Sequence, residues 1–397
     1  MHHSLLVNKN LGKRLLIVLF IWITSLILCF SAFSQTLPAN FQAQLVCNSW
    51  TNLEGFRFDN TGQMYVWEKA GKVWVVDTNG VKLPNPLIDI SEEVGDWRDH
   101  GLNGFALDPN FRVNGYFYLY YTVDRHYLMN YGTANYNAST NQYYSATISR
   151  VTRYQANAAT NFTSLVPNSR LILIGETKKN GIPVLHESHS GGQLVFGTDG
   201  SLLVSTGDGA SYTAIDSGSH PVTYWSQALA DSIIVLKENV GSFRSQLVDC
   251  LNGKILRIDP TSGNGLNTNP YFDASAPRSA KSRVWALGLR NPFRMSLRPG
   301  TGNTDITAGN PGVLYIGDVG WDNWEDLNVC TGPAQNFGWP VFEGLTTHTG
   351  YYNASPFNRD APNPLDGNGG CNQPFFRFRD LIIQATLNPY SWPNPCS

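Results

Sequence analysis

The amino-acid sequence predicts an all-β protein and, within that class, a β-propeller. Glycine and proline are abundant, with 37 and 22 copies in 397 residues, which is typical of a chain that turns often. An apolar strand, a turn with Gly or Pro, and a second apolar or aromatic strand recur, with no long amphipathic helix between the copies. Sheets repeated in this way suggest radial blades around a central channel. A β-sandwich is the alternative.

The N-terminal segment has the residue order of a secretory signal peptide. Three basic residues, Lys9, Lys13 and Arg14, precede an apolar run over residues 15–30, and small residues follow at 32–34. We expect residues 1–34 to be removed before Gln35, and residues 35–397 to be secreted, periplasmic or held at the cell surface as one propeller domain. A transmembrane anchor is the rival interpretation, but about 16 apolar residues are short for a membrane span.

Four predicted hairpins follow the signal segment. They occupy residues 56–66, 105–120, 194–204 and 295–316. In each, two short apolar or aromatic runs flank a turn with Gly or Pro, the pattern of paired antiparallel strands. The spacing between them is uneven. We expect the long inserts at 131–144 and 214–239 to be surface loops outside the sheets.

The third hairpin brings two chemically useful residues together. His189 lies just before its first strand and Asp208 just after its second, so hairpin geometry places both at the same end of the sheet. A carboxylate that accepts from one imidazole nitrogen fixes the tautomer and leaves the other nitrogen free as a general base. The alternative is structural: His189 caps a loop, and Asp208 closes an Asx-turn.

The charge balance argues against one class of partner. The chain has 28 Lys and Arg against 30 Asp and Glu, and the signal segment carries three of the basic residues and none of the acidic ones, which leaves −5. The sequence shows no basic stripe. We therefore expect no nucleic-acid partner, because affinity for phosphate backbones comes mainly from clustered Lys and Arg.

Five cysteines follow the signal segment, at positions 47, 250, 330, 371 and 396. Their scatter and the export signal favour disulfides over zinc, since no close Cys or Cys/His pair has metal-ligand spacing. Because five is odd, we expect at most two internal disulfides, with one thiol free or paired beyond Ser397. The preferred pair is Cys330 with Cys371, which flank a segment poor in regular structure.

Seven short motifs lie along the chain, at residues 99–111, 189–194, 207–208, 253–260, 288–292, 317–320 and 336–340. They include His-Ser-Gly-Gly-Gln-Leu at 189–194 and Gly-Leu-Arg-Asn-Pro at 288–292. As a set, and in this order, they resemble the glucose/sorbosone dehydrogenase family. The resemblance implies a six-bladed propeller. The family includes soluble quinoprotein sugar dehydrogenases, which use pyrroloquinoline quinone (PQQ) and calcium, and the propeller of hedgehog-interacting proteins, which is a binding module.

The resemblance also implies roles for individual residues. His189 matches the family's catalytic base, which takes the proton of the sugar's anomeric hydroxyl, and Asp208 matches the carboxylate that orients it. Arg290 and Asn291 match the pair that hydrogen-bonds the quinone oxygens. Asp99 falls where the enzymes place a polar residue near the base.

A calcium site is implied at two further positions. Gly320 and Trp321 match residues whose backbone carbonyls hold calcium against the cofactor. Four carboxylates crowd the same stretch and suggest a second calcium site: Asp318, Asp322, Glu325 and Asp326.

The chain departs from the enzymes after Pro340. In the quinoproteins, basic residues that bind the cofactor's carboxylates lie in the last blade. Here only 57 residues follow Pro340; they are rich in Asn, Pro and Gly and show no clear closing hairpin. We therefore expect an incomplete last blade and a chain truncated at its C-terminus. Arg377 and Arg379 come too early in the order to be assigned to the cofactor.

Two function classes remain open. The first is an exported quinoprotein oxidoreductase that oxidises an aldose or a related sugar with PQQ and calcium. The second is a non-catalytic propeller that binds a protein or a glycan. The joint presence of His189, Asp208, Arg290 and Asn291 favours the enzyme. Calcium-dependent hydrolysis is disfavoured, because the sequence has no Gly-x-Ser-x-Gly nucleophile turn.

Overall fold

The computed structural model describes residues 37–382. The chain divides into two compact units, residues 1–48 and 49–397. In the first unit, the described residues 37–48 contain no helix or strand, and the predicted signal peptide at 1–34 lies outside the described residues. Within residues 37–382, no helix is long and apolar enough to cross a membrane. The sheets and sites below belong to the second unit.

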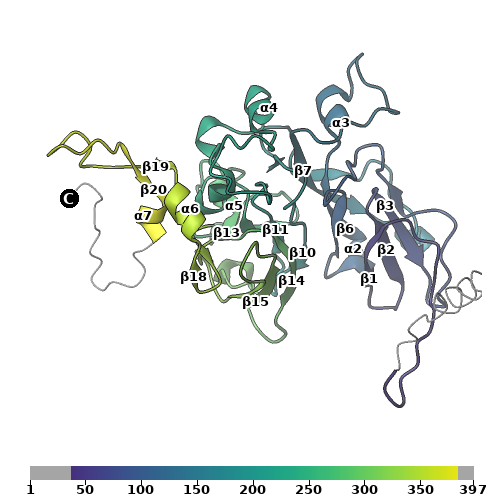
Figure 1. Ribbon diagram of the computed structural model, residues 1–397. Coiled ribbons are helices and arrows are strands. Elements are labelled where there is room, and N and C mark those ends of the chain that lie inside the picture. Colours follow the sequence, from purple (N-terminus) through teal and green to yellow (C-terminus); the bar gives the residue numbers. More distant parts are fainter. Residues whose placement is uncertain (1–36, 383–397) are drawn as a thin grey trace, which may run out of the picture. The chain divides into compact units, whose positions relative to one another are not determined.

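The fold is an all-β propeller, and its described residues form four antiparallel sheets of three or more strands (Figure 1). Sheet 1 contains β1 (Leu53–Phe58), β2 (Met64–Glu68), β3 (Lys72–Val76) and β4 (Ile88–Asp89). Sheet 2 contains β5 (Leu102–Leu107), β6 (Tyr116–Thr122), β7 (Thr147–Gln155), β8 (Leu171–Ile174) and β9 (Ile182–Val184). Sheet 3 contains β10 (Leu194–Phe196), β11 (Leu202–Thr206), β12 (Lys254–Ile258) and β13 (Val284–Leu287). Sheet 4 contains β14 (Pro292–Leu297), β15 (Leu314–Asp318) and β16 (Asp326–Cys330).

Helices are short and lie in the connections. None of those in the described residues exceeds six residues, as the sequence predicts. They are α2 (Phe111–Asn114), α3 (Arg125–Asn130), η1 (Ala158–Thr160), α4 (Trp225–Ala230), η2 (Leu236–Glu238), η3 (Gly241–Gln246), α5 (Ala280–Arg283), η4 (Ile306–Ala308), α6 (Thr349–Ala354) and α7 (Phe378–Ile382).

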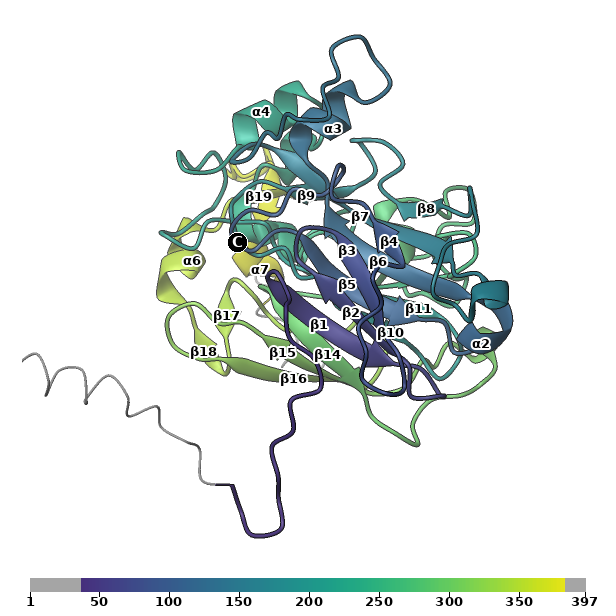
Figure 2. The same cartoon turned by 90° about the vertical axis from the view of Figure 1, so that its right-hand side faces the viewer.

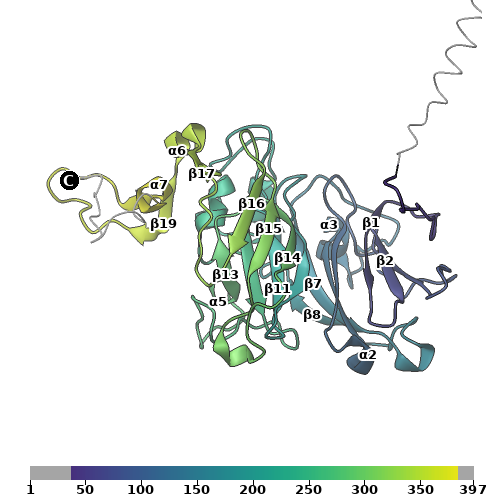
Figure 3. The ribbon, with the colours of Figure 1, turned by 90° about the horizontal axis from the view of Figure 1, so that it is seen from below.

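The first strands of the four sheets lie next to one another in chain order. Contacts join β1 to β5, β5 to β10 and β10 to β14, and Figure 3 shows the sheets following in the same sequence from purple to green. An ion pair of 3.0 Å between the side chains of Glu54 and Arg294 also links β1 to β14, and Figure 2 shows β1 in front of β14. Sheets that meet through their first strands are propeller blades, which excludes the sandwich.

Each neighbouring pair of sheets encloses its own core, and the two-residue period of the strands explains how. In β6, Phe117 and Leu119 pack against sheet 1, whereas Tyr118 and Tyr120 pack against sheet 3. Residues of β11 alternate in the same way between the core shared with sheet 2 and the core shared with sheet 4. Because both faces are buried, these strands are predominantly apolar, and neither has a polar face turned to solvent.

All four predicted hairpins are confirmed, as β1–β2, β5–β6, β10–β11 and β14–β15. The predicted number of six blades is not confirmed, since the described residues contain four such sheets.

The insert at 214–239 is not wholly a loop, because it contains α4 and η2. The stretch after Pro340 also differs from the prediction: it forms two antiparallel pairs, β17 (Phe342–Glu343) with β18 (Thr346–Thr347), and β19 (Phe357–Pro362) with β20 (Phe375–Arg377).

The predicted pairing of Cys330 with Cys371 is wrong, because Cys330 is a free thiol. Its side chain is buried at the end of β16, in the core between sheets 3 and 4 with Trp285 and Leu314. Burial raises the pKa of the Cys330 thiol to about 11. A sulfur packed among apolar side chains behaves as a small core residue, which is why the loop-closure argument failed here.

Candidate active site

The site begins at the β10–β11 hairpin of sheet 3. Leu194 pairs with Val204 and Phe196 with Leu202, across a turn that includes Gly200 at φ +77°. Asp199 in this turn forms an ion pair of 2.6 Å with the buried Arg257. Both of these side chains are fully buried. The turn is therefore rigid, and it fixes where the two ends of the hairpin lie.

His189 and Asp208 meet at the open end of this hairpin, as the sequence predicts. His189 Nδ1 and Asp208 Oδ1 are 2.8 Å apart, and the side chains are 5% and 0% exposed. The backbones of the two strands touch here, since a Cβ on Gly207 would lie 2.0 Å from the carbonyl oxygen of His189. Only glycine allows this approach. His189 itself has a left-handed backbone, with φ +60°.

Asp208 is a fully satisfied carboxylate. Its Oδ1 also accepts from the Ala210 amide at 2.9 Å, and its Oδ2 accepts from the Trp339 indole Nε1 at 2.8 Å. Burial alone raises the pKa of Asp208, but His189, Arg290 and the Ala210 amide outweigh burial and hold this pKa below its usual value. Asp208 is therefore ionised at neutral pH and can only accept hydrogen bonds.

The ionised carboxylate determines the tautomer of His189. In the neutral imidazole, Nδ1 carries the proton that it shares with Asp208, and Nε2 holds a lone pair. No residue within 37–382 forms a hydrogen bond with Nε2. His189 thus offers one free basic nitrogen, with its orientation fixed from behind.

A cavity of about 550 Å³ lies against His189. Six of the seven predicted site residues line it, namely Asp99, His189, Arg290, Asn291, Gly320 and Trp321, together with Arg98, Glu187, Ser188, Tyr212 and Val319. The seventh, Asp208, stands behind His189. The volume of the cavity falls in the usual range for small-molecule sites. The structure therefore brings together residues that are more than 200 positions apart in the sequence.

Arg290 is the buried cationic group of the cavity. Its Nη1 donates to the carbonyl oxygens of Val319 and Gly320 at 3.0 and 2.9 Å, and its guanidinium lies 5.4 Å from the ring centre of Trp339. Its Nε is buried and has no hydrogen-bond partner among the described residues. A buried donor without an acceptor is costly, and an oxygen of a bound group would satisfy it.

Asp318 positions the backbone of Arg290 and Asn291. One carboxylate oxygen accepts from the Arg290 amide at 3.0 Å, and the other from the Asn291 amide at 2.7 Å. The Asn291 side chain then accepts from the Gly191 amide at 3.0 Å, next to the hairpin. Burial raises the pKa of Asp318 to about 7. The turn before β14 is therefore tied both to β15 and to the segment that carries His189.

The four carboxylates of the suggested second calcium site do not gather into a metal-binding cluster. Within residues 37–382, no group of three or more His, Cys, Asp or Glu side chains could hold a metal ion. Two of the four carboxylates accept hydrogen bonds from backbone amides instead: Asp318 from Arg290 and Asn291, and Glu325 from Gly320 at 3.0 Å. Glu343, which the sequence analysis missed, accepts from the amides of Trp321, Asp322 and Asn323 and holds the turn in place.

Sequence reasoning missed two parts of the site. Trp339 donates to Asp208 from 131 positions away, and only its place in the motif at 336–340 could have drawn attention to it. The other part is a polar rim: the Tyr212 hydroxyl donates to Glu187 at 2.7 Å, Arg98 pairs with Glu187 at 3.3 Å, and Trp321 Nε1 donates to the Tyr212 carbonyl at 3.0 Å.

Comparisons with known proteins point to one family. The model of the family described as Glucose / Sorbosone dehydrogenase matches residues 53–390. The chain is 26% identical over 312 residues to the HIPL2 protein of Arabidopsis thaliana, covering 72% of this chain and 40% of that protein. It is 24% identical over 324 residues to quinoprotein glucose dehydrogenase B of Acinetobacter calcoaceticus, covering 81% and 57%. It thus spans less than two thirds of either curated relative.

One solved structure is similar over most of the chain. The PQQ-bound form of aldose sugar dehydrogenase from Streptomyces coelicolor superposes with a TM-score of 0.50 and 21% identity, covering 77% of this chain and 68% of that one. At this identity the similarity shows the fold alone.

Proposed function

The chain belongs to the glucose/sorbosone dehydrogenase family, and from this premise we propose that it is an exported oxidoreductase that oxidises an aldose or a related sugar with PQQ and calcium. The observation that carries the proposal is the buried His189–Asp208 pair at a cavity also lined by Arg290 and Asn291. A fixed base and a donor-rich cationic surface in one cavity suit the removal of a proton and a hydride from a sugar carbinol.

We assign His189 as the general base. Its Nε2 takes the proton of the anomeric hydroxyl while a hydride leaves the anomeric carbon, so that the sugar becomes a lactone. Asp208 does not take the proton. Held ionised by three donors at 2.8–2.9 Å, it stabilises the imidazolium that forms and keeps the ring oriented.

The residues of the cavity fit a quinone. Arg290 has a buried Nε without an acceptor, and Asn291 is fixed beside it through Gly191 and Asp318. These two side chains would hold the quinone oxygens, with Asp99 near the base. When bound, PQQ supplies the two-electron acceptor for the hydride. The Arg290 guanidinium would stabilise the negative charge that develops on those oxygens.

For calcium, the proposal rests on the backbone carbonyls of Gly320 and Trp321. The Gly320 oxygen accepts from Arg290 Nη1 at 2.9 Å. A cation at this oxygen would therefore compete with the guanidinium, and Arg290 would have to give up that bond. Binding of calcium alone should be weak for this reason, and stronger when an anionic ligand draws Arg290 away.

The test is a titration of the protein with PQQ, with and without calcium, followed by dye reduction across a panel of aldoses. We expect His189→Ala to lower sugar-dependent dye reduction by on the order of 10²–10⁴ while leaving quinone binding nearly intact. Arg290→Ala should weaken both. His220→Ala is the matched control, because His220 is half-buried outside the cavity and should not affect either measurement.

Absence of quinone binding and of dye reduction with every aldose would contradict the dehydrogenase. It would favour the alternative, a propeller that binds a protein or a glycan through its loops. Equal activity of His189→Ala and the unmodified protein would contradict the role of His189 even if the quinone binds.

A further inference from the structure

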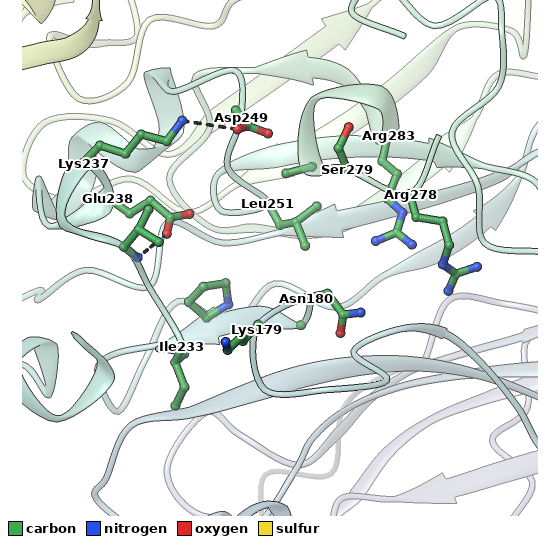
Figure 4. Close-up of a pocket in the computed structure, with 14 residues that line it drawn as sticks. Lys179, Asn180, Ile233, Lys237, Glu238, Asp249, Leu251, Arg278, Ser279 and Arg283 are labelled. Atoms are coloured by element: carbon green, nitrogen blue, oxygen red, sulfur yellow. Dashed lines mark hydrogen bonds and ion pairs between the residues drawn. The ribbon is translucent and has the colours of Figure 1, made fainter. Parts of the chain in front are cut away.

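A second cavity, of about 290 Å³, opens between sheets 2 and 3. It is bounded by the segment before β9, by residues 233–251 and by the turn that leads through α5 into β13 (Figure 4). It shares no residue with the cavity of His189. Its charged lining residues are Lys179, Lys237, Arg278 and Arg283 on the basic side, against Glu238 and Asp249.

Two of the four basic residues already have acidic partners. Lys237 pairs with Asp249 at 3.2 Å and with Asp360 at 3.1 Å. Arg278 forms an ion pair with Glu176, and its Nη2 donates to the Leu173 carbonyl at 2.9 Å. These contacts fix both side chains at the wall of the cavity.

Arg283 is different, because it is buried without a counter-charge. The residue is only 1% exposed, and no carboxylate within residues 37–382 lies at ion-pair distance from it. Its Nε donates to the Gly263 carbonyl at 2.9 Å and its Nη2 to the Leu173 carbonyl at 3.1 Å, but its Nη1 has no partner among the described residues. The buried Arg257, in contrast, pairs with Asp199 at 2.6 Å.

The surroundings of Arg283 disfavour its charge. Burial, together with repulsion from Arg278, lowers the pKa of Arg283 to about 9. Figure 4 shows the two guanidinium groups next to each other at one end of the cavity, with the Asn180 amide facing the same space. Asn180 uses its side-chain oxygen to accept from Thr177, so its NH₂ group stays free to donate.

We propose that this cavity binds a small oxyanion, the carboxylate or phosphate group of a small molecule, with Arg283 as the buried cation. An anion between two guanidiniums would remove their mutual repulsion and would occupy the free Nη1. Guanidinium donors match carboxylate and phosphate oxygens in pairs, which favours these groups over chloride. The small volume and the acidic side chains of Glu238 and Asp249 disfavour a large polyanion.

The proposal is tested by calorimetric titration with inorganic phosphate in one arm and sodium acetate in the other, at constant ionic strength made up with chloride. We expect saturable one-site binding in at least one arm, and the arm that binds identifies the group. Arg278→Gln should weaken that binding by about tenfold or more, since it removes one charge-assisted contact. Arg283→Met should abolish it.

A neighbouring lysine provides the control. Lys178→Gln removes one positive charge, as Arg278→Gln does, and Lys178 is next in sequence to Lys179 of the lining but does not itself line the cavity. It should leave the affinity unchanged. If Arg283→Met does not fold, Arg278→Gln carries the test on its own. No saturable binding in either arm, or an unchanged affinity in Arg278→Gln, would overturn the proposal. Neither sugar nor quinone enters the measurement, so the result is independent of the proposed dehydrogenase activity.

Discussion

Replacement of Trp339 by Phe tests how Asp208 is held ionised in the interior. The substitution keeps an aromatic ring beneath Arg290 but removes the indole N–H that lies 2.8 Å from Asp208 Oδ2. Asp208 is completely buried, so water cannot replace the lost donor. We expect the folded protein to be less stable at neutral pH, and the pKa of Asp208 to rise.

The size of the effect follows from the kind of bond. A hydrogen bond to an ionised group contributes about 1.5–3 kcal/mol, roughly twice a neutral one. Loss of ring volume adds a further destabilisation, which has to be subtracted.

Trp67→Phe measures the destabilisation that comes from lost ring volume alone. Trp67 is buried to a similar degree, 6% exposed against 4% for Trp339, and its indole Nε1 makes no hydrogen bond among the described residues. Urea unfolding at pH 7 should therefore show Trp339→Phe to be less stable than Trp67→Phe by about 1.5–3 kcal/mol.

The same pair of variants gives a pH test. The pKa of Asp208 in the folded state lies below its usual value. Its stabilising contribution is therefore present above the unfolded-state pKa of about 3.9 and is lost as the pH falls through the folded-state pKa. The difference between the two variants should shrink on acidification. Equal stability of both variants at pH 7 would refute this account of Asp208.

Three further predictions follow from the contacts around the hairpin and the core. Gly207→Ala should destabilise the fold by about 3 kcal/mol or more and lower the yield of soluble protein, because the new Cβ would lie 2.0 Å from the His189 carbonyl; normal unfolding by urea would contradict this. Asp199→Asn should cost about 3–5 kcal/mol in the same assay, since it leaves the buried charge of Arg257 unpaired; a loss below 1 kcal/mol would show that the pair is dispensable. Cys330 should react with a thiol reagent only after unfolding, because burial raises its pKa to about 11; rapid labelling of the native protein would contradict its place in the core.

Local signals in the sequence predicted the hairpins and the central pair of the site. Strand period and turn residues act over a dozen positions, so the placement of His189 and Asp208 at the same end of β10–β11 could be derived from spacing alone. The bond from Trp339 could not, because it joins parts of the chain 131 positions apart that meet only when the sheets pack.

The failed expectations share another physical cause. The four carboxylates near residue 320 suggest metal ligands, but loops expose many backbone amides, and Asp318 and Glu325 bind such amides instead. Composition shows how many acceptors a stretch contains and not how many remain unused. In the same way, nothing about the place of Cys330 along the chain predicts that its strand buries it between two sheets.

The two-sided burial of the middle sheets has a consequence for how the molecule moves. Sheets 2 and 3 are packed on both faces, whereas apolar side chains of sheet 1 such as Phe56 and of sheet 4 such as Leu327 are 53% and 73% exposed. Amide hydrogens in β6 and β11 should therefore exchange with solvent only in rare, near-global openings, while those in β1 and β16 exchange through local fluctuations. His189 and Asp208 flank the β10–β11 pair, so the proposed base should sit on a part of the protein that fluctuates little.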